Sequence, residues 1–154
     1  MALKKYNGEP VWMFYIASGW FNARQAEDLT IIKKTLDAAE VKYFSPMDEV
    51  ICPPNADDAM RREVFEHNMF GIHHSKFMIV NTRDKDMGTI FEAGVAYQNK
   101  KKIIYVAFGL EGDFNLMLAQ SGICVCRTVA DLERAVKKSI ENPDWSEVFT
   151  GTIE

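Results

Sequence analysis

The sequence predicts an α/β domain in which mostly parallel strands carry helices on both faces. Short continuous apolar runs, such as Phe77–Val80, are typical of strands that are covered on both sides. Amphipathic helical segments separate these runs, so that strand and helix alternate along the chain. The length of 154 residues fits one domain, and 47% hydrophobic residues are enough for one core. We therefore expect a single domain over residues 1–154.

Each element is predicted from its own pattern. Apolar runs predict strands at 11–17, 42–44, 77–81, 102–107 and 123–126. Helical spacing predicts helices at 23–40, 58–73, 88–99, 115–120 and 129–141. Thr128, followed by Asp131 three residues later, is typical of a capping box before the last helix. The proline-containing segment 45–57 is predicted to be a long loop beside a pocket, and the tail 142–154 to dock through its apolar residues. We expect five strands in a flavodoxin-like order.

Composition excludes several classes of function. The formal net charge of −4 and the pI of about 5.4 give no basic field for nucleic acid or a membrane surface. No apolar stretch reaches the roughly 18 residues of a membrane span, and Met1–Pro10 lacks the apolar region of a signal peptide. Cys124 and Cys126 alternate on a predicted strand and are expected to be buried thiols, which fits a reducing, cytoplasmic setting.

No metal or cofactor is predicted. The three cysteines have no metal-ligand spacing, and the chain has neither a dinucleotide-binding glycine pattern nor a P-loop. His67, His73 and His74 are not framed by a carboxylate–histidine pattern. We expect these histidines at a helix C-terminus, where positive charge is favourable.

The segment Asp84–Tyr97 carries the candidate chemistry. It follows the predicted strand 77–81 and enters a helix in which Glu92 stands among apolar residues. Carboxylates are rarely buried unless paired, and open α/β sheets bind ligands just beyond the carboxyl ends of their strands. Asp86 precedes the helix, and Gly88 at its start permits close backbone approach. Two converging carboxylates suit nucleophilic or acid–base work on a glycosidic bond. The alternative on pattern alone is that Asp86 caps the helix and Glu92 is solvated.

Four separated segments carry motifs that occur together in one family. They are Tyr15–Phe21, which ends in Gly-Trp-Phe; Asn68–Ile72, similar to the end of Asn-Asp-Leu-x-Gly-Ile; Asp86–Gly94, similar to Asp-x-Gly-x-x-x-Glu-x-Gly; and Asn115–Gly122, which contains Asn-Leu-Met. Each motif alone is weak, whereas four in order with matching spacing are specific. Over most of its length the chain resembles the nucleoside 2-deoxyribosyltransferase family.

The resemblance implies transfer of 2-deoxyribose from a 2-deoxynucleoside to a free nucleobase, without a cofactor. It implies that Glu92 is the nucleophile, which forms a covalent deoxyribosyl-enzyme with overall retention. Tyr15 matches the tyrosine that holds the nucleophile, although a core tyrosine is the alternative. Asp86 matches the residue that binds the sugar 5′-hydroxyl. Asn115 matches one that reaches this hydroxyl from a neighbouring subunit, and it also fits a helix N-cap.

The resemblance also implies a pocket and an assembly. The further substrate-binding residues that it implies are Gly19, Trp20, Phe21, Asn68, Gly88 and Met117. The assembly that it implies is a homo-oligomer built from dimers, up to a hexamer. The chain departs from the family at Asn68, where an aspartate usually handles the base proton, because an amide cannot take up a proton. The family's C-terminal tyrosine is also absent, so base preference and the acid for the leaving base stay open.

Two other functions remain open at this stage. One is a related hydrolase of 2-deoxynucleoside 5′-monophosphates, whose members carry a serine at the position of Asn115 and a Gly/Arg-rich first loop. Asn115 and Trp20-Phe21 favour a nucleoside with a free 5′-hydroxyl, whereas Arg24, at the first predicted helix, could bind a 5′-phosphate. The other is a nucleotide-binding module without turnover, which would not need a nucleophile such as Glu92.

Overall fold

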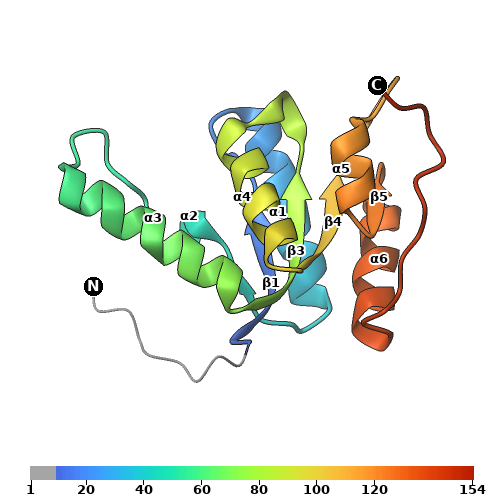
Figure 1. Cartoon of the computed structure of the whole chain (residues 1–154), viewed down its shortest axis with the longest axis horizontal. Helices are drawn as coiled ribbons and strands as arrows, with labels where there is room; N and C mark the ends of the chain where they lie inside the picture. The colour runs from blue at the N-terminus through green and yellow to red at the C-terminus, as the bar shows by residue number, and fades with distance from the viewer. Residues whose placement is uncertain (1–9) are drawn as a thin grey trace.

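The computed structural model describes residues 10–154 and confirms the predicted α/β architecture (Figure 1). Five strands form one parallel sheet in the order β2-β1-β3-β4-β5, which is the flavodoxin-like order. The strands are β1 Trp12–Ala17, β2 Tyr43–Phe44, β3 Ser75–Asn81, β4 Lys102–Val106 and β5 Cys124–Cys126. Residues 1–9, which form most of the polar segment Met1–Pro10, lie outside the described residues.

Helices cover both faces of this sheet. They are α1 Ala23–Ala38, α2 Pro46–Glu49, α3 Asp58–His73, α4 Met87–Gln98, α5 Leu116–Ser121 and α6 Val129–Glu141, and a 3-10 turn, η1 Arg83–Lys85, precedes α4. Residues of α1 and α6 share one apolar cluster on one face. Residues of α3, α4 and α5 pack into a second cluster on the other face. No described helix is long and apolar enough to cross a membrane.

Alternation along β1 determines which side chains meet which layer of helices. Phe14 and Ile16 belong to the cluster beneath α1 and α6. Tyr15 and Ala17, which point the other way, belong to the cluster beneath α3 and α4. Helices therefore cover β1 on both faces, as its continuous apolar sequence predicts. Tyr15 is therefore directed toward the helix layer that holds Glu92.

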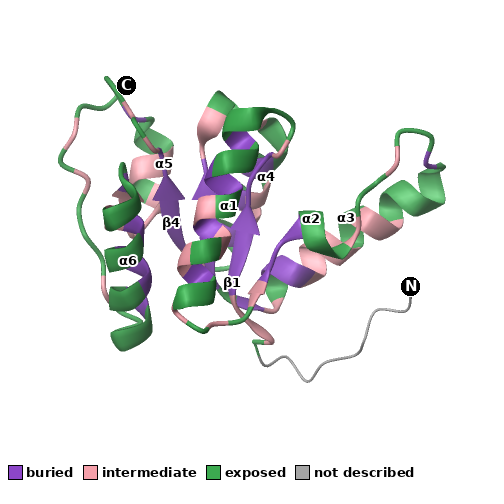
Figure 2. Ribbon diagram, turned by 180° about the vertical axis from the view of Figure 1, so that it is seen from behind, coloured by how far each residue is buried: buried purple, intermediate pink, exposed green. Residues whose placement is uncertain are grey.

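Helix α3 extends well beyond the sheet (Figure 1). Only Gly71 and Ile72, in its last turn, are buried, and the far end of the helix is mostly exposed (Figure 2). Gly71 lets α3 approach β2 closely, because a Cβ at this position would lie 2.9 Å from the ring of Phe44. Phe65, near the middle of α3, is exposed in the single chain.

The last helix and the tail agree with prediction. The Thr128 side chain accepts a hydrogen bond from the Asp131 amide, and Asp131 completes the capping box. The tail docks on its own domain, because the amide of Glu147 donates to Ile123 and Ile153 bridges to Phe114. Cys124 and Cys126 are buried free thiols on one face of β5, as predicted.

The predicted loop 45–57 is wrong in one detail, because its first residues form the short helix α2. Pro46 occupies the first turn, where its fixed φ suits a helix and its missing N–H costs nothing. The histidine expectation is also wrong in part. His73 and His74 end α3, but His67 lies inside this helix and its Nε2 is 3.2 Å from Oε2 of Glu49 on α2.

Candidate active site

Glu92 lies on α4, in the layer of helices that covers Tyr15 and β3. The helix begins directly after the turn that follows β3, so its first turns stand at the carboxyl end of the sheet. The Glu92 side chain is partly exposed. The pKa of this carboxyl is raised to about 8, because burial raises it strongly, the Tyr15 hydroxyl lowers it in part, and the negative charge of Asp86 adds a smaller rise. Glu92 is therefore protonated in much of the free protein at neutral pH.

Tyr15 is the neighbour of Glu92 from the sheet. Its side chain is fully buried, and its ring stacks on Phe44 with centroids 5.1 Å apart. Burial raises the pKa of the Tyr15 hydroxyl well above its usual value, and the Glu92 carboxyl adds to this shift. The two groups interact, yet the hydroxyl has no hydrogen bond of normal geometry within residues 10–154. The two groups are therefore adjacent, and the Tyr15 hydroxyl is free to form a hydrogen bond with another rotamer of Glu92 or with a ligand.

Asp86 has the capping role that pattern alone offered as the alternative. Its carboxylate accepts a hydrogen bond of 2.9 Å from the Thr89 amide at the start of α4. The same carboxylate acts electrostatically on Glu92, so the cap and the candidate nucleophile share one site. Gly88 lies in this first turn, and a Cβ there would meet Asp86 Oδ2 at 3.5 Å, which is ordinary contact. Close packing therefore does not require a glycine at this position.

Among the described residues, several buried polar atoms have no hydrogen-bond partner, and three of them lie on residues that contact or adjoin Phe44. These three are Oη of Tyr15, Oγ of Ser45 and Nδ1 of His67; Oδ1 of Asn68 follows on α3, and Oγ of Ser139 lies apart on α6. Tyr15 and His67 both contact the Phe44 ring, with centroid distances of 5.1 Å and 5.3 Å. Buried polar atoms normally have a partner, so this cluster indicates a place where water or a ligand completes the hydrogen bonds.

Tyr15 and Asn68 are among the site residues that the sequence predicts, whereas Ser45 and His67 are not. Ser45 follows the two-residue strand β2 and precedes α2, and no local pattern distinguishes it from an ordinary loop serine. For His67 the sequence raises only a metal ligand or a residue at a helix C-terminus. Its position directly before Asn68 on a predicted helix was the one available signal.

The loop after β1 holds the three predicted residues Gly19, Trp20 and Phe21. A Cβ at Gly19 would lie 2.6 Å from Oε1 of Gln25, so a side chain there would displace the Gln25 carboxamide. Trp20 packs against the core, with its ring 5.1 Å from that of Phe21. Phe21 is 72% exposed and is available to contact a ligand. The loop lies at the carboxyl end of β1, next to the start of α4 through η1.

Asn115 and Met117 lie elsewhere in the single chain. The Asn115 side chain accepts hydrogen bonds from the amides of Met117 and Leu118 and caps α5. Met117 is 73% exposed and lines a cavity of about 270 Å³ with Ala93 and Tyr97 of α4. At about 100° per residue, Ala93 and Tyr97 lie roughly 100° and 140° around α4 from Glu92, so this cavity is on another side of the helix. One chain thus brings together Glu92, Tyr15 and Asp86, but not the pair on α5.

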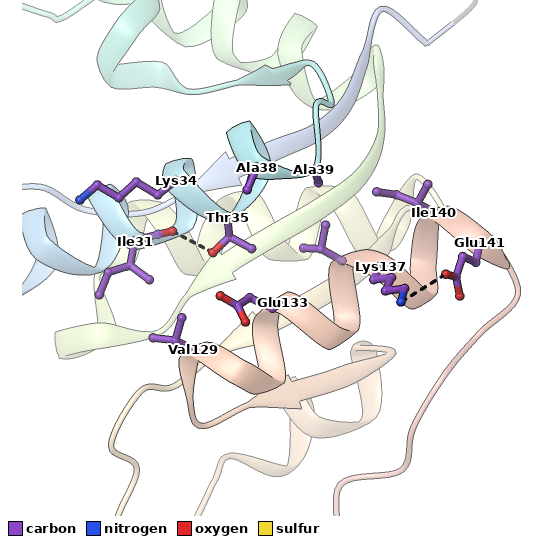
Figure 3. A pocket seen from close by; sticks show the side chains of 11 residues that line it. Ile31, Lys34, Thr35, Ala38, Ala39, Val129, Glu133, Lys137, Ile140 and Glu141 are labelled. Atoms are coloured by element: carbon purple, nitrogen blue, oxygen red, sulfur yellow. Dashed lines mark hydrogen bonds and ion pairs between the residues drawn. The ribbon is translucent and has the colours of Figure 1, made fainter.

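The candidate active site is not in the largest cavity. The largest of the described cavities, about 630 Å³, is a groove between α1 and α6 (Figure 3). Its walls include Ile31 and Ile140, and its charged residues Lys137 and Glu141 face each other at 4.0 Å. The groove is on the opposite face of the sheet from Tyr15. Within residues 10–154, no three histidine, cysteine or carboxylate side chains are grouped to hold a metal ion.

Comparisons with known proteins agree with this fold. The 2-deoxyribosyltransferase of the psychrotolerant bacterium Bacillus psychrosaccharolyticus superposes with a TM-score of 0.68 at 23% identity, covering 78% of this chain and 89% of that one. A conserved protein from Enterococcus faecalis V583 gives a TM-score of 0.65 at 15% identity, covering 81% and 96%. At these identities the likeness shows the fold alone. A search of curated proteins found no match.

A family model is more specific than the structural likeness. The model described as nucleoside 2-deoxyribosyltransferase matches residues 14–138. This range begins just before Tyr15 and includes Asp86, Glu92 and Asn115 together with all five strands except the first residues of β1. The match covers most of the sequence, and the chain therefore belongs to the nucleoside 2-deoxyribosyltransferase family.

Proposed function

We propose that this protein is a nucleoside 2-deoxyribosyltransferase, which moves 2-deoxyribose between nucleobases through a covalent intermediate on Glu92. The observation that supports this most is the placement of Glu92, a partly buried carboxyl between Tyr15 and Asp86 at the carboxyl end of the sheet. A carboxyl with its pKa raised by burial is not expected at an ordinary core position or on a solvated helix face. Strongly shifted carboxyls in such positions are typical of functional sites.

The chemistry has two displacement steps. The ionised Glu92 attacks C1′ of the nucleoside, and the bond from C1′ to the base nitrogen breaks with its electron pair leaving on the base. The departing base takes up a proton. A second base then attacks C1′ through a ring nitrogen, gives up its N–H proton to water and releases the Glu92 carboxylate, so that two inversions give overall retention. Each transition state resembles an oxocarbenium ion, which the Glu92 carboxylate stabilises electrostatically.

Tyr15 prepares this nucleophile, and Asp86 binds the sugar. The Tyr15 hydroxyl lowers the pKa of Glu92 and so favours the ionised, attacking form. Its lack of another partner leaves it free to orient the carboxylate. Asp86 would accept a hydrogen bond from the sugar 5′-hydroxyl while it keeps its bond to the Thr89 amide, because a carboxylate has several acceptor positions.

The base would lie toward the cluster around Phe44. Asn68 offers an amide whose Oδ1 is buried without a partner, which suits an N–H on the edge of a base. Since Asn68 cannot supply a proton, we propose that water protonates the departing base. Gly19, Trp20 and Phe21 would form the opposite wall.

A homo-oligomer would complete the site. Asn115 and Met117 lie away from Glu92 in their own chain, and Met117 is exposed. Phe65 on the projecting α3 and Phe91 on α4 also form an exposed aromatic pair, 6.0 Å apart. These features support a second copy that covers α3 and α4 and presents its own Asn115 to the sugar.

The test is base exchange, followed by HPLC, with a 2′-deoxynucleoside and an excess of a second base. Wild type should produce the exchanged nucleoside, and Glu92→Ala should lose this activity by several orders of magnitude. Glu133→Ala, on the exposed side of α6, is the matched control and should be unchanged. Free base without exchange, or preference for a 5′-monophosphate, would support the hydrolase instead. Tight nucleotide binding without turnover would support the binding module.

A further inference from the structure

Asp28 is a buried acid outside the proposed catalytic group. It lies on α1 and is 4% exposed, and its two carboxylate oxygens bind the guanidinium of Arg83 on η1. The Nε–Oδ2 distance is 2.7 Å and the Nη2–Oδ1 distance is 2.9 Å. Two parallel hydrogen bonds of this kind fix orientation as well as distance. The pair therefore fixes η1 relative to α1.

Asn81, at the end of β3, extends this ion pair into a network. Its Nδ2 lies 3.3 Å from Asp28 Oδ2 and 3.1 Å from the hydroxyl of Ser18, the first residue after β1. Its Oδ1 accepts a hydrogen bond of 3.2 Å from the Arg83 amide. The network thus joins the end of β1, the end of β3 and the start of η1.

The turn that this network holds has an unfavourable backbone. Asp84 and Lys85 have φ values of 59° and 54°, in the left-handed region that residues with a side chain rarely adopt. Such residues persist where surrounding contacts determine them. A second contact assists here, because Nδ2 of Asn22 donates to Asp84 Oδ2 at 2.8 Å. Asn22 also caps α1, so the turn is fixed to the start of α1 at two points.

The two segments that the network joins are those that the proposed function places on either side of the substrate. Asp86, the residue immediately after the turn, carries the proposed contact to the sugar 5′-hydroxyl. Gly19–Asn22, on the other side, forms the proposed wall of the base pocket. Gln25 secures this loop from α1, because its Oε1 accepts a hydrogen bond of 2.9 Å from the Phe21 amide. A shift of η1 against α1 would change the distance between the two contacts.

We propose that the Asp28–Arg83 ion pair is a positioning device, which sets Asp86 relative to the base pocket and so makes the 5′-hydroxyl contact productive. The inference rests on the proposed function. Neither residue touches the substrate. The binding energy of the 5′-hydroxyl accelerates the reaction only when the residue that binds it, Asp86, is held in place. The Asp28–Arg83 ion pair holds Asp86 in place.

The test compares Arg83→Met with Arg134→Met on two substrates. Arg134 makes a similar two-point contact with Glu147, with one distance of 3.0 Å, but between α6 and the tail. With a 2′-deoxynucleoside, Arg83→Met should lower kcat/KM about tenfold or more, while Arg134→Met stays within about twofold of wild type. With the 2′,5′-dideoxynucleoside, which lacks the 5′-hydroxyl, Arg83→Met and wild type should react at nearly equal rates. Arg83→Lys should recover part of the loss on the first substrate.

A merely structural pair gives a different pattern. In that case Arg83→Met would lower kcat/KM equally for both substrates. That result, or an unchanged kcat/KM for both substrates, would overturn the proposal. If Arg83→Met does not fold, Asp28→Asn, which has nearly the same shape, replaces it with the same expectations.

A second measurement separates this proposal from the proposed function. If wild type shows no turnover of any nucleoside, the proposed function fails. Amide hydrogen exchange at Thr89 still reports whether the pair holds Asp86, because the Asp86 cap protects that amide. Faster exchange in Arg83→Met but not in Arg134→Met supports the positioning role, and equal protection in both variants overturns it.

Discussion

Replacing Glu92 by glutamine should stabilise the folded protein, and the gain should grow with pH. The pKa of Glu92 is raised from 4.5 to about 8 in the folded chain, mainly by burial. Between these values the unfolded chain releases a proton that the folded chain retains, so the ionisation opposes folding. Wild type therefore loses stability as pH rises from about 4.5 toward about 8, whereas a glutamine does not titrate.

The magnitude follows from the interval between the two pKa values. At about 1.4 kcal/mol per pH unit, the interval corresponds to a loss of about 3 kcal/mol at pH 7 and about 5 kcal/mol above pH 8. Both figures are ceilings, because the Glu92 side chain keeps partial access to water. Glutamine has a similar shape, so the packing beside Tyr15 changes little.

The assay is urea unfolding of wild type and Glu92→Gln at about pH 5, 7 and 9. The difference in unfolding free energy should be small at the lowest pH and increase by roughly 2–4 kcal/mol at the highest. Glu133→Gln, at an exposed position, should show no such trend. A difference that stays constant with pH, or that shrinks as pH rises, would refute the assignment of a desolvated carboxyl to Glu92.

Three further predictions, one of which compares two glycine substitutions, test other parts of the account. Since the Tyr15 hydroxyl lowers the pKa of Glu92, Tyr15→Phe should move the rise of kcat/KM with pH to more alkaline values; an unchanged profile would contradict their contact. Asn68→Asp should raise kcat at acid pH for purine nucleosides, because a carboxylic acid near the base can protonate it. Rates equal to wild type, measured by HPLC, would show that residue 68 does not lie beside the base. Gly71→Ala should lower the free energy of unfolding by about 1–3 kcal/mol, because the added Cβ overpacks against Phe44. Gly94→Ala has open space around its Cβ and should raise the free energy of unfolding by up to about 1 kcal/mol. Similar melting temperatures for the two variants would contradict the packing of Gly71 against Phe44.

Much of the fold could be predicted because local patterns and tertiary packing agree. Helices α3 and α6 have the predicted bounds, and the Thr128 capping box forms as expected. Helix α2 escaped prediction because four residues carry no helical period, and Pro46 is as typical of a loop as of a first helical turn.

The candidate site was predictable only where a motif carries it. Glu92 and Asp86 stand in one continuous segment, so their proximity follows from the start of a single helix. The Asp28–Arg83 pair joins residues 55 positions apart, and a buried aspartate in an amphipathic helix looks like a solvated one in sequence. The positive φ angles of Asp84 and Lys85 also have no sequence signal, because neither residue is glycine.

The most direct test of the central claim is to look for the covalent intermediate. Wild type is mixed with a 2′-deoxynucleoside, quenched in acid during turnover and examined by intact-mass and peptide mass spectrometry. The account predicts a mass gain of one deoxyribosyl group on the peptide that contains Glu92, which disappears when excess free base is added before the quench. Active enzyme that never carries this adduct, or that carries it on another residue, would contradict the claim that Glu92 is the nucleophile.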